Sequence, residues 1–135
     1  MSNLKFPFEK SSSEIFGSVW RPIAKVGFWS KKIKNWVDII MIVDTGADYT
    51  ILPRFYAFDL GVNLDRDCRI YQTFGIGGNE KVYLLRNARV KLGKWKDSVP
   101  IGFLDRDNIP PLLGRQKFLE IFKVTLVNHI TIFSK

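Results

Sequence analysis

Short apolar runs rich in Val, Ile, Phe and Trp alternate along this chain with clusters of Gly, Pro, Asn and Asp. This pattern is typical of strands joined by turns. It predicts strands over residues 19–29, 35–43, 49–52, 68–74, 81–85, 88–92, 95–103, 109–113, 124–127 and 130–133. Short helical patterns occupy residues 53–60, which Gly61 ends, and residues 115–122. We therefore expect an all-β, closed, barrel-like domain with one or two short helices.

The N-terminal segment has a different pattern. Residues 1–16 mix charged and aromatic side chains around three consecutive serines, which indicates a loop or flexible arm. Pro22 suggests an edge position for the first predicted strand, because proline cannot donate to a sheet. A chain of 135 residues has the size of one domain. The predicted organisation is an arm over residues 1–17 and one domain over residues 18–135.

Composition excludes several protein classes. The chain is 46% hydrophobic, yet no apolar run is long enough to cross a bilayer. Its first ten residues carry charges and lack the apolar segment of a secretory signal. Cys68 is the single cysteine, so an internal disulfide is impossible. We expect a cytoplasmic protein with no membrane partner.

The formal charge of +8 raises the question of an acidic partner. The basic residues are scattered, and only residues 31–34 form a cluster, at a predicted hairpin tip. A solvated basic surface is the favoured interpretation. Contact with nucleic acid is the less favoured one.

The candidate chemistry begins where residues 39–43 run directly into Asp44-Thr45-Gly46. Such an apolar run predicts a strand buried on both faces, with a carboxylate at the edge of a dry core. Gly46 allows close backbone approach, and the Thr45 hydroxyl can hold the turn. The stretch is therefore either a catalytic acid on a rigid loop or an ordinary turn.

Two further motifs favour the catalytic interpretation. A glycine-rich tip, Gly75-Ile76-Gly77, lies between two strand-like runs, and Leu-Leu-Gly114-Arg115 follows later. With Asp-Thr-Gly, these motifs resemble in order and spacing the retroviral-type aspartic proteases, or retropepsins. The resemblance extends from about residue 20 to residue 126.

The resemblance implies a role for each matching residue. It assigns catalysis to Asp44, Thr45 and Gly46, substrate binding to Ala47, Asp48, Gly75, Ile76 and Gly77, and structural support to Gly114 and Arg115. The glycine-rich tip would be a mobile flap. An ion pair between Asp48 and Arg115 is expected. That these two residues only stabilise the fold is at least as open an interpretation as direct contact with substrate. Tyr49 and the longer terminal segments depart from the viral pattern.

Peptide hydrolysis by carboxylates needs two of them, and this chain contains one Asp-Thr-Gly. The resemblance therefore implies a homodimeric aspartic endopeptidase acting on an extended peptide or polyprotein. Such an endopeptidase requires no metal and no cofactor. The alternative is a retropepsin-like binding or assembly domain with little or no proteolysis. A thiol protease based on Cys68 and His129 is disfavoured, because neither residue has an activating neighbourhood in the sequence.

Overall fold

The computed structural model describes residues 3–75 and 78–135, and the all-β prediction is confirmed. The strands of the N-terminal half are β1 (Leu4–Pro7), β2 (Glu9–Ser13), β3 (Gly17–Arg21), β4 (Ile23–Ser30), β5 (Asn35–Val43) and β6 (Thr50–Pro53). Those that follow are β7 (Arg69–Gly75), β8 (Gly78–Leu92), β9 (Trp95–Leu104), β10 (Leu112–Leu113), β11 (Lys123–Val127) and β12 (Ile130–Ser134). The helices are α1 (Phe55–Asp59), α2 (Leu64–Asp67) and the 3-10 helix η1 (Leu119–Ile121). In the part of the chain that is described, none of them has the length and apolar character needed to cross a membrane.

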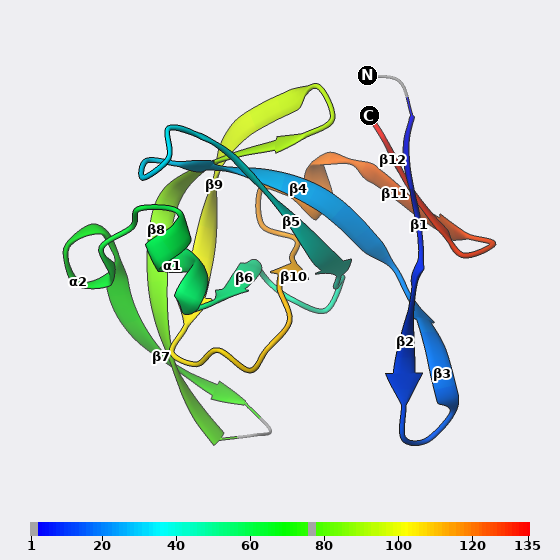
Figure 1. Ribbon diagram of the computed structural model, residues 1–135, viewed down its shortest axis with the longest axis horizontal. Helices are drawn as coiled ribbons and strands as arrows, with labels where there is room; N and C mark the ends of the chain where they lie inside the picture. Colours follow the sequence, from blue (N-terminus) through cyan, green and yellow to red (C-terminus); the bar gives the residue numbers. More distant parts are fainter. Residues whose placement is uncertain (1–2, 76–77) are drawn as a thin grey trace.

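Seven strands form a sheet that closes on itself (Figure 1). Their order is β4-β5-β10-β6-β9-β8-β7, and β8 also pairs with β4, which completes a ring. The short strand β10 runs parallel to β5, and β6 runs parallel to β9. Inside the ring lie Phe28, Met41, Leu52, Ile101 and Phe103, all without solvent exposure. The closed sheet buries one face of each strand and leaves the other to solvent.

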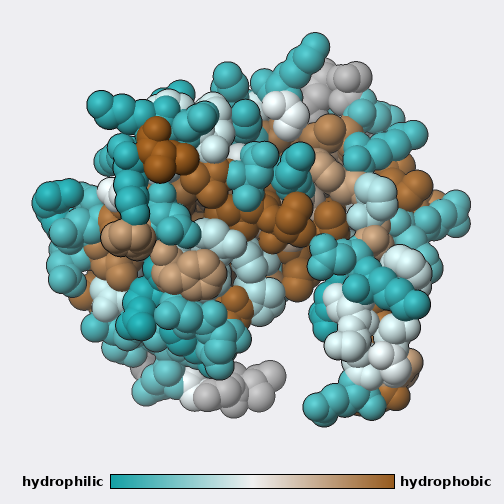
Figure 2. Space-filling view, in the orientation of Figure 1, coloured by the Kyte–Doolittle hydropathy of each residue, from teal (hydrophilic) through white to brown (hydrophobic). Residues whose placement is uncertain are grey.

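Strand β5 does not have the two buried faces that its apolar run predicts. Ile39, Met41 and Val43 point into the core, whereas Ile40 is 46% exposed. The prediction is wrong because β5 belongs to a single-layered ring, where side chains alternate between core and solvent. Figure 2 shows hydrophobic side chains gathered over this part of the sheet.

The N-terminal segment is a pair of strands, and its prediction as a loop or flexible arm is wrong. Strand β1 pairs with β12, and β2 forms a hairpin with β3. Phe6 packs edge-on against the fully buried Phe133, with ring centroids 6.0 Å apart. Apolar side chains anchor this segment to the rest of the fold, although its three serines indicated a loop. The division between arm and domain at residue 17 stays a prediction.

Two further segments differ from the predicted pattern, and one turn agrees with it. Pro22 splits the first predicted strand into β3 and β4, since it cannot donate to a ladder. The predicted helix over residues 115–122 is reduced to η1, because Lys117 adopts a φ of 54° that no α-helix contains. Asn128 and His129 have φ values of 48° and 57°, as a two-residue hairpin turn between the predicted strands 124–127 and 130–133 requires.

Replacing Phe6 with Ala should lower the free energy of unfolding by roughly 2 kcal/mol, because it removes a half-buried ring from Phe133. Urea denaturation measures the change. The matched control is Lys5→Ala on the exposed face of the same strand, which should be nearly silent. Equal stability of both variants would show that β1 is not docked on β12.

Candidate active site

The Asp-Thr-Gly segment forms a tight loop between β5 and β6. The Asp44 backbone N–H donates to the Leu113 carbonyl at 3.0 Å, which continues the pairing of β5 with β10. The Ala47 N–H donates to the Asp44 carbonyl at 3.1 Å and closes a turn. Both ends of the loop are therefore fixed to the barrel wall, so Asp44 has a defined place.

The Asp44 side chain is oriented by its own loop. Its Oδ1 accepts a hydrogen bond from the Gly46 N–H at 3.0 Å, and the residue is half-buried. A Cβ at position 46 would lie 3.3 Å from the same oxygen, so glycine fits here with least crowding. Thr45 and Gly46 are exposed at the outer side of the turn. The carboxylate is therefore held half-buried beside the exposed Thr45 and Gly46.

Arg115 connects the two ends of this loop. Its Nη1 donates to the Thr45 carbonyl and its Nη2 to Asp48 Oδ1, both at 2.6 Å. The predicted Asp48–Arg115 ion pair is thus present. The Asp48 side chain is 82% exposed and that of Arg115 44%, so solvent screens the pair. The guanidinium fixes the shape of the loop more than it stabilises the fold.

Gly114 allows the loop and the segment after β10 to run in contact. The Gly114 N–H donates to the buried Thr50 Oγ1 at 3.2 Å. The Arg115 N–H donates to the Ala47 carbonyl at 3.0 Å, and the Gln116 N–H to the Asp48 carbonyl at 2.8 Å. A Cβ on Gly114 would lie 2.3 Å from the Tyr49 carbonyl carbon and oxygen. Only glycine permits this approach.

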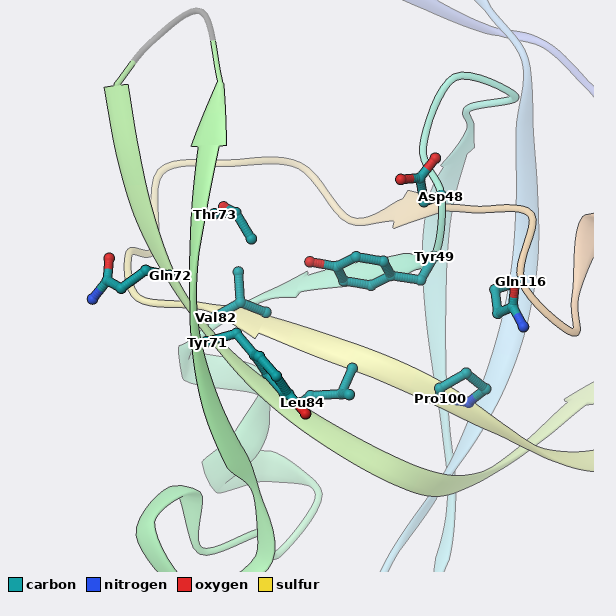
Figure 3. Close-up of a pocket in the computed structure, with 9 residues that line it drawn as sticks. All are labelled: Asp48, Tyr49, Tyr71, Gln72, Thr73, Val82, Leu84, Pro100 and Gln116. Atoms are coloured by element: carbon teal, nitrogen blue, oxygen red, sulfur yellow. The ribbon is translucent and has the colours of Figure 1, made fainter.

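A hollow of about 440 Å³ opens on the β6 side of the loop (Figure 3). Its lining is mostly apolar and comprises Asp48, Tyr49, Tyr71, Gln72, Thr73, Val82, Leu84, Pro100 and Gln116. Tyr49 reaches from the loop across the hollow toward Thr73 and Val82. Burial and then the charge of Asp48 raise the pKa of the Tyr49 phenol, so it stays neutral at physiological pH.

The position of the Tyr49 ring depends on a glycine in β9. A Cβ on Gly102 would lie 2.7 Å from Tyr49 Cε2 and 2.8 Å from Val82 Cγ1. The ring therefore rests directly on the β9 backbone. The sequence pattern singled out Tyr49 as a departure from the viral motif but did not identify its neighbours in the hollow, which come from strands distant in sequence.

A second hollow of about 440 Å³ lies on the β5 side of the loop. Ile23, Ile40, Ile42 and two prolines give it an apolar wall, and Glu9, Ser11 and Arg21 give it a polar rim. Ile42 of this hollow precedes Asp44 by two positions, and Asp48 of the first hollow follows it by four, so each hollow includes a residue close to Asp44 in the chain. No pattern in the sequence indicates this hollow, because Glu9 and Ser11 of its rim come from the segment predicted as a loop.

The β7–β8 hairpin stands beside the first hollow (Figure 3). Gly75 pairs with Gly78 across it, and Thr73 Oγ1 donates to the Glu80 carbonyl at 3.3 Å. The predicted flap residues Ile76 and Gly77 lie outside the described residues. In the described part of the hairpin, Thr73 on β7 and Val82 on β8 line the first hollow together with Asp48 and Tyr49 of the loop.

The alternative chemistries receive no support from geometry. Burial, followed by the charge of Asp67, raises the pKa of the Cys68 thiol to about 11, which disfavours the nucleophilic thiolate. His129 is stacked on Trp20, with ring centroids 5.1 Å apart, in the turn between β11 and β12. Within residues 3–75 and 78–135, no three His, Cys, Asp or Glu side chains gather as a metal site would require.

Comparison with known proteins agrees with this geometry. The family model described as aspartyl protease matches residues 32–116, most of the chain, and the chain belongs to this family. Its fold is similar to that of a retropepsin-like aspartic protease from Rickettsia conorii, with 23% sequence identity, 98% of each chain covered and a TM-score of 0.65. No curated protein matches the sequence. The predicted resemblance to the retropepsin-type aspartic proteases is confirmed.

Replacing Gly114 with Ala should destabilise the protein by roughly 2–3 kcal/mol, because the methyl group collides with the Tyr49 peptide. Urea denaturation and amide exchange of residues 44–49 provide the measurement. Gly17→Ala is the control, since Gly17 has a φ of 75° but nothing within 4 Å of a Cβ. It should cost about 1 kcal/mol from backbone strain alone. A smaller loss for Gly114→Ala than for Gly17→Ala would contradict the packing argument.

Proposed function

We propose that this protein is an aspartic endopeptidase whose active form is a symmetric homodimer with one Asp44 from each copy. The observation that carries the proposal is the fixed loop around Asp44 in a chain of the aspartyl protease family. The chain has one Asp-Thr-Gly, so one copy supplies half of a two-carboxylate site. A two-fold axis beside the exposed Thr45 and Gly46 would bring the two Asp44 side chains together.

The mechanism follows from two carboxyl groups that share one proton. Like charges a few ångströms apart cannot both ionise, as the known dyads of aspartic proteases illustrate. The ionised Asp44 would take a proton from a water molecule as it attacks the peptide carbonyl carbon. The protonated Asp44 would donate its proton to the carbonyl oxygen, which gives a tetrahedral diol. As the C–N bond breaks, the Asp44 that took the water proton would give it to the leaving nitrogen, and the other Asp44 would take back a proton from a diol hydroxyl. Because both protonation states are needed, activity is confined to a pH window.

The supporting residues have roles in this mechanism. Gly46 directs Asp44 Oδ1 through its N–H, and the exposed Thr45 hydroxyl is free to bond the partner's loop. Arg115 and Gly114 keep the loop in one shape before substrate arrives, which lowers the cost of reaching the transition state. Ala47 and Asp48 lie where the main chain of a bound peptide would pass.

The substrate that fits best is an extended peptide with bulky apolar side chains. Each of the two hollows has an apolar wall, and each includes a residue within four positions of Asp44, so they would receive side chains near the cut. The flap residues Gly75, Ile76 and Gly77 would cover the peptide and exclude water. Asp48 and Gln116 at the edge of the first hollow offer polar partners to the peptide main chain.

Replacing Asp44 with Asn should reduce peptide cleavage roughly a thousandfold or more, because an amide keeps the shape of the carboxyl but cannot act as a base. The assay compares both proteins on an apolar-rich peptide library across acidic to neutral pH. The wild type should show a bell-shaped dependence with its maximum below neutrality. Sedimentation should give a dimer for both proteins at micromolar concentration.

Two results would overturn the proposal. Equal cleavage by wild type and Asp44→Asn would mean that another group performs hydrolysis. A wild type that stays monomeric even with a statine-type peptide inhibitor would leave the site incomplete. A dimer without cleavage of any peptide would instead favour the binding or assembly function.

Tyr49→Ala should shift cleavage toward larger side chains in the first hollow, raising their kcat/KM relative to small ones by roughly tenfold. The control is Tyr49→Phe, which keeps the ring on Gly102 and should keep the original preference. Sequencing of cleaved library peptides measures both. An unchanged preference in Tyr49→Ala would show that this hollow does not receive a substrate side chain.

A further inference from the structure

A cluster of two tryptophans and several basic side chains occupies the outer face of the barrel, at the end of β5 remote from Asp44. We call it the tryptophan–cation cluster, and it consists of Trp29, Trp36, Arg89, Lys91 and Lys96. Trp36 precedes Asp44 by eight positions of extended strand, roughly 25 Å. The cluster is therefore separate from the hollows described above.

The sheet register assembles the cluster from four strands. Trp29 on β4 faces Trp36 on β5, with ring centroids 5.4 Å apart and planes 77° apart. The Arg89 guanidinium lies 5.1 Å from the Trp29 ring centroid and 5.6 Å from that of Trp36. The ammonium groups of Lys91 and Lys96 lie 4.9 Å and 5.8 Å from the Trp36 ring. The rings hold three cations in a small area.

Gly27 contributes to this arrangement from β4. A Cβ at position 27 would lie 2.7 Å from Lys91 Cγ and 2.9 Å from Lys91 Cε. The aliphatic stem of Lys91 thus lies flat on the β4 backbone, which directs its ammonium group toward Trp36. Lys25 is exposed two positions earlier on the same outward side of β4. It extends the row of cations along the strand.

Within the described part of the chain, the cations of the cluster form no ion pair with a carboxylate. Lys91 and Lys96 are direct cross-strand partners, and like charges in such a pair destabilise a sheet. Asp38 and Asp97 are the carboxylates in the neighbouring register positions. Among the described residues, neither forms an ion pair with Lys25, Arg89, Lys91 or Lys96, whereas Arg54, Arg66, Arg106 and Arg115 are all ion-paired.

We propose that the tryptophan–cation cluster binds single-stranded nucleic acid. Several fixed cations match the repeated phosphates of the backbone, and release of counterions would supply much of the affinity. Both indole rings are partly exposed among the cations, and unpaired bases stack on the accessible faces of such rings. An acidic peptide would use the cations but not the rings. The formal charge of +8 adds a favourable long-range field.

The test measures fluorescence anisotropy of a labelled single strand of about twelve nucleotides, mixed with the full chain at low salt. The triple variant Arg89→Gln, Lys91→Gln, Lys96→Gln should weaken binding at least tenfold. The control variant Lys5→Gln, Lys123→Gln, Lys135→Gln removes the same charge from exposed positions elsewhere and should weaken it about twofold or less. Thermal melting checks that each variant is folded. Should the first variant fail to fold, the exposed pair Lys25→Gln, Lys96→Gln replaces it, with Lys5→Gln, Lys123→Gln as control.

Trp36→Leu separates stacking from charge, because it keeps every cation. It should weaken binding severalfold, and oligonucleotide should quench tryptophan emission in the wild type but less in this variant. Equal weakening by the cluster and control variants would overturn the proposal, as would an undetectable wild-type interaction. Tighter binding to duplex of the same length, or equal competition by polyglutamate, would also overturn it. Asp44→Asn should bind normally, so the outcome is independent of proteolysis.

Discussion

The close approach of two backbone segments is the constraint on which the candidate site depends. Residues 47–50 and 113–116 run so near each other that a Cβ at Gly114 has no room beside the Tyr49 peptide. Backbone hydrogen bonds from Arg115 and Gln116 occupy the carbonyls of the facing loop. The loop is therefore formed by main-chain packing, and side chains such as Arg115 refine it. Such a site loses little conformational entropy when a ligand binds.

Closure of the barrel makes that approach possible. Strand β10 is two residues long, but it lies between β5 and β6 and joins the two edges of the Asp44 loop. Leu113 anchors it in the core with no exposure, next to Val43 on β5. Hydrophobic burial thus positions a polar loop, since any shift of Leu113 would move the hydrogen bonds that hold Asp44.

The parts that could be predicted from sequence are those with local determinants. Strand β5 has its predicted bounds because a polar turn precedes it and Asp-Thr-Gly ends it. The pairing of Asp48 with Arg115, 67 positions apart, has no local determinant and was implied by the resemblance to the retropepsins. The pairing of β1 with β12 is long-range and was missed, as was the turn that Lys117 makes with a positive φ. The hollows were missed for the same reason, because no local pattern records which strands meet across the ring.

The contact between Tyr49 and Gly102 links the loop to a strand more than fifty positions later in the sequence. Any side chain at 102 would take the space of the ring, so bulk at one position excludes bulk at the other. The hollow beside Asp44 can therefore be reshaped by exchanging volume between a loop and a barrel strand. Among related chains, a larger residue at 102 would need small residues at both 49 and 82, because a Cβ at 102 meets both side chains. The three positions form one volume constraint and should vary together.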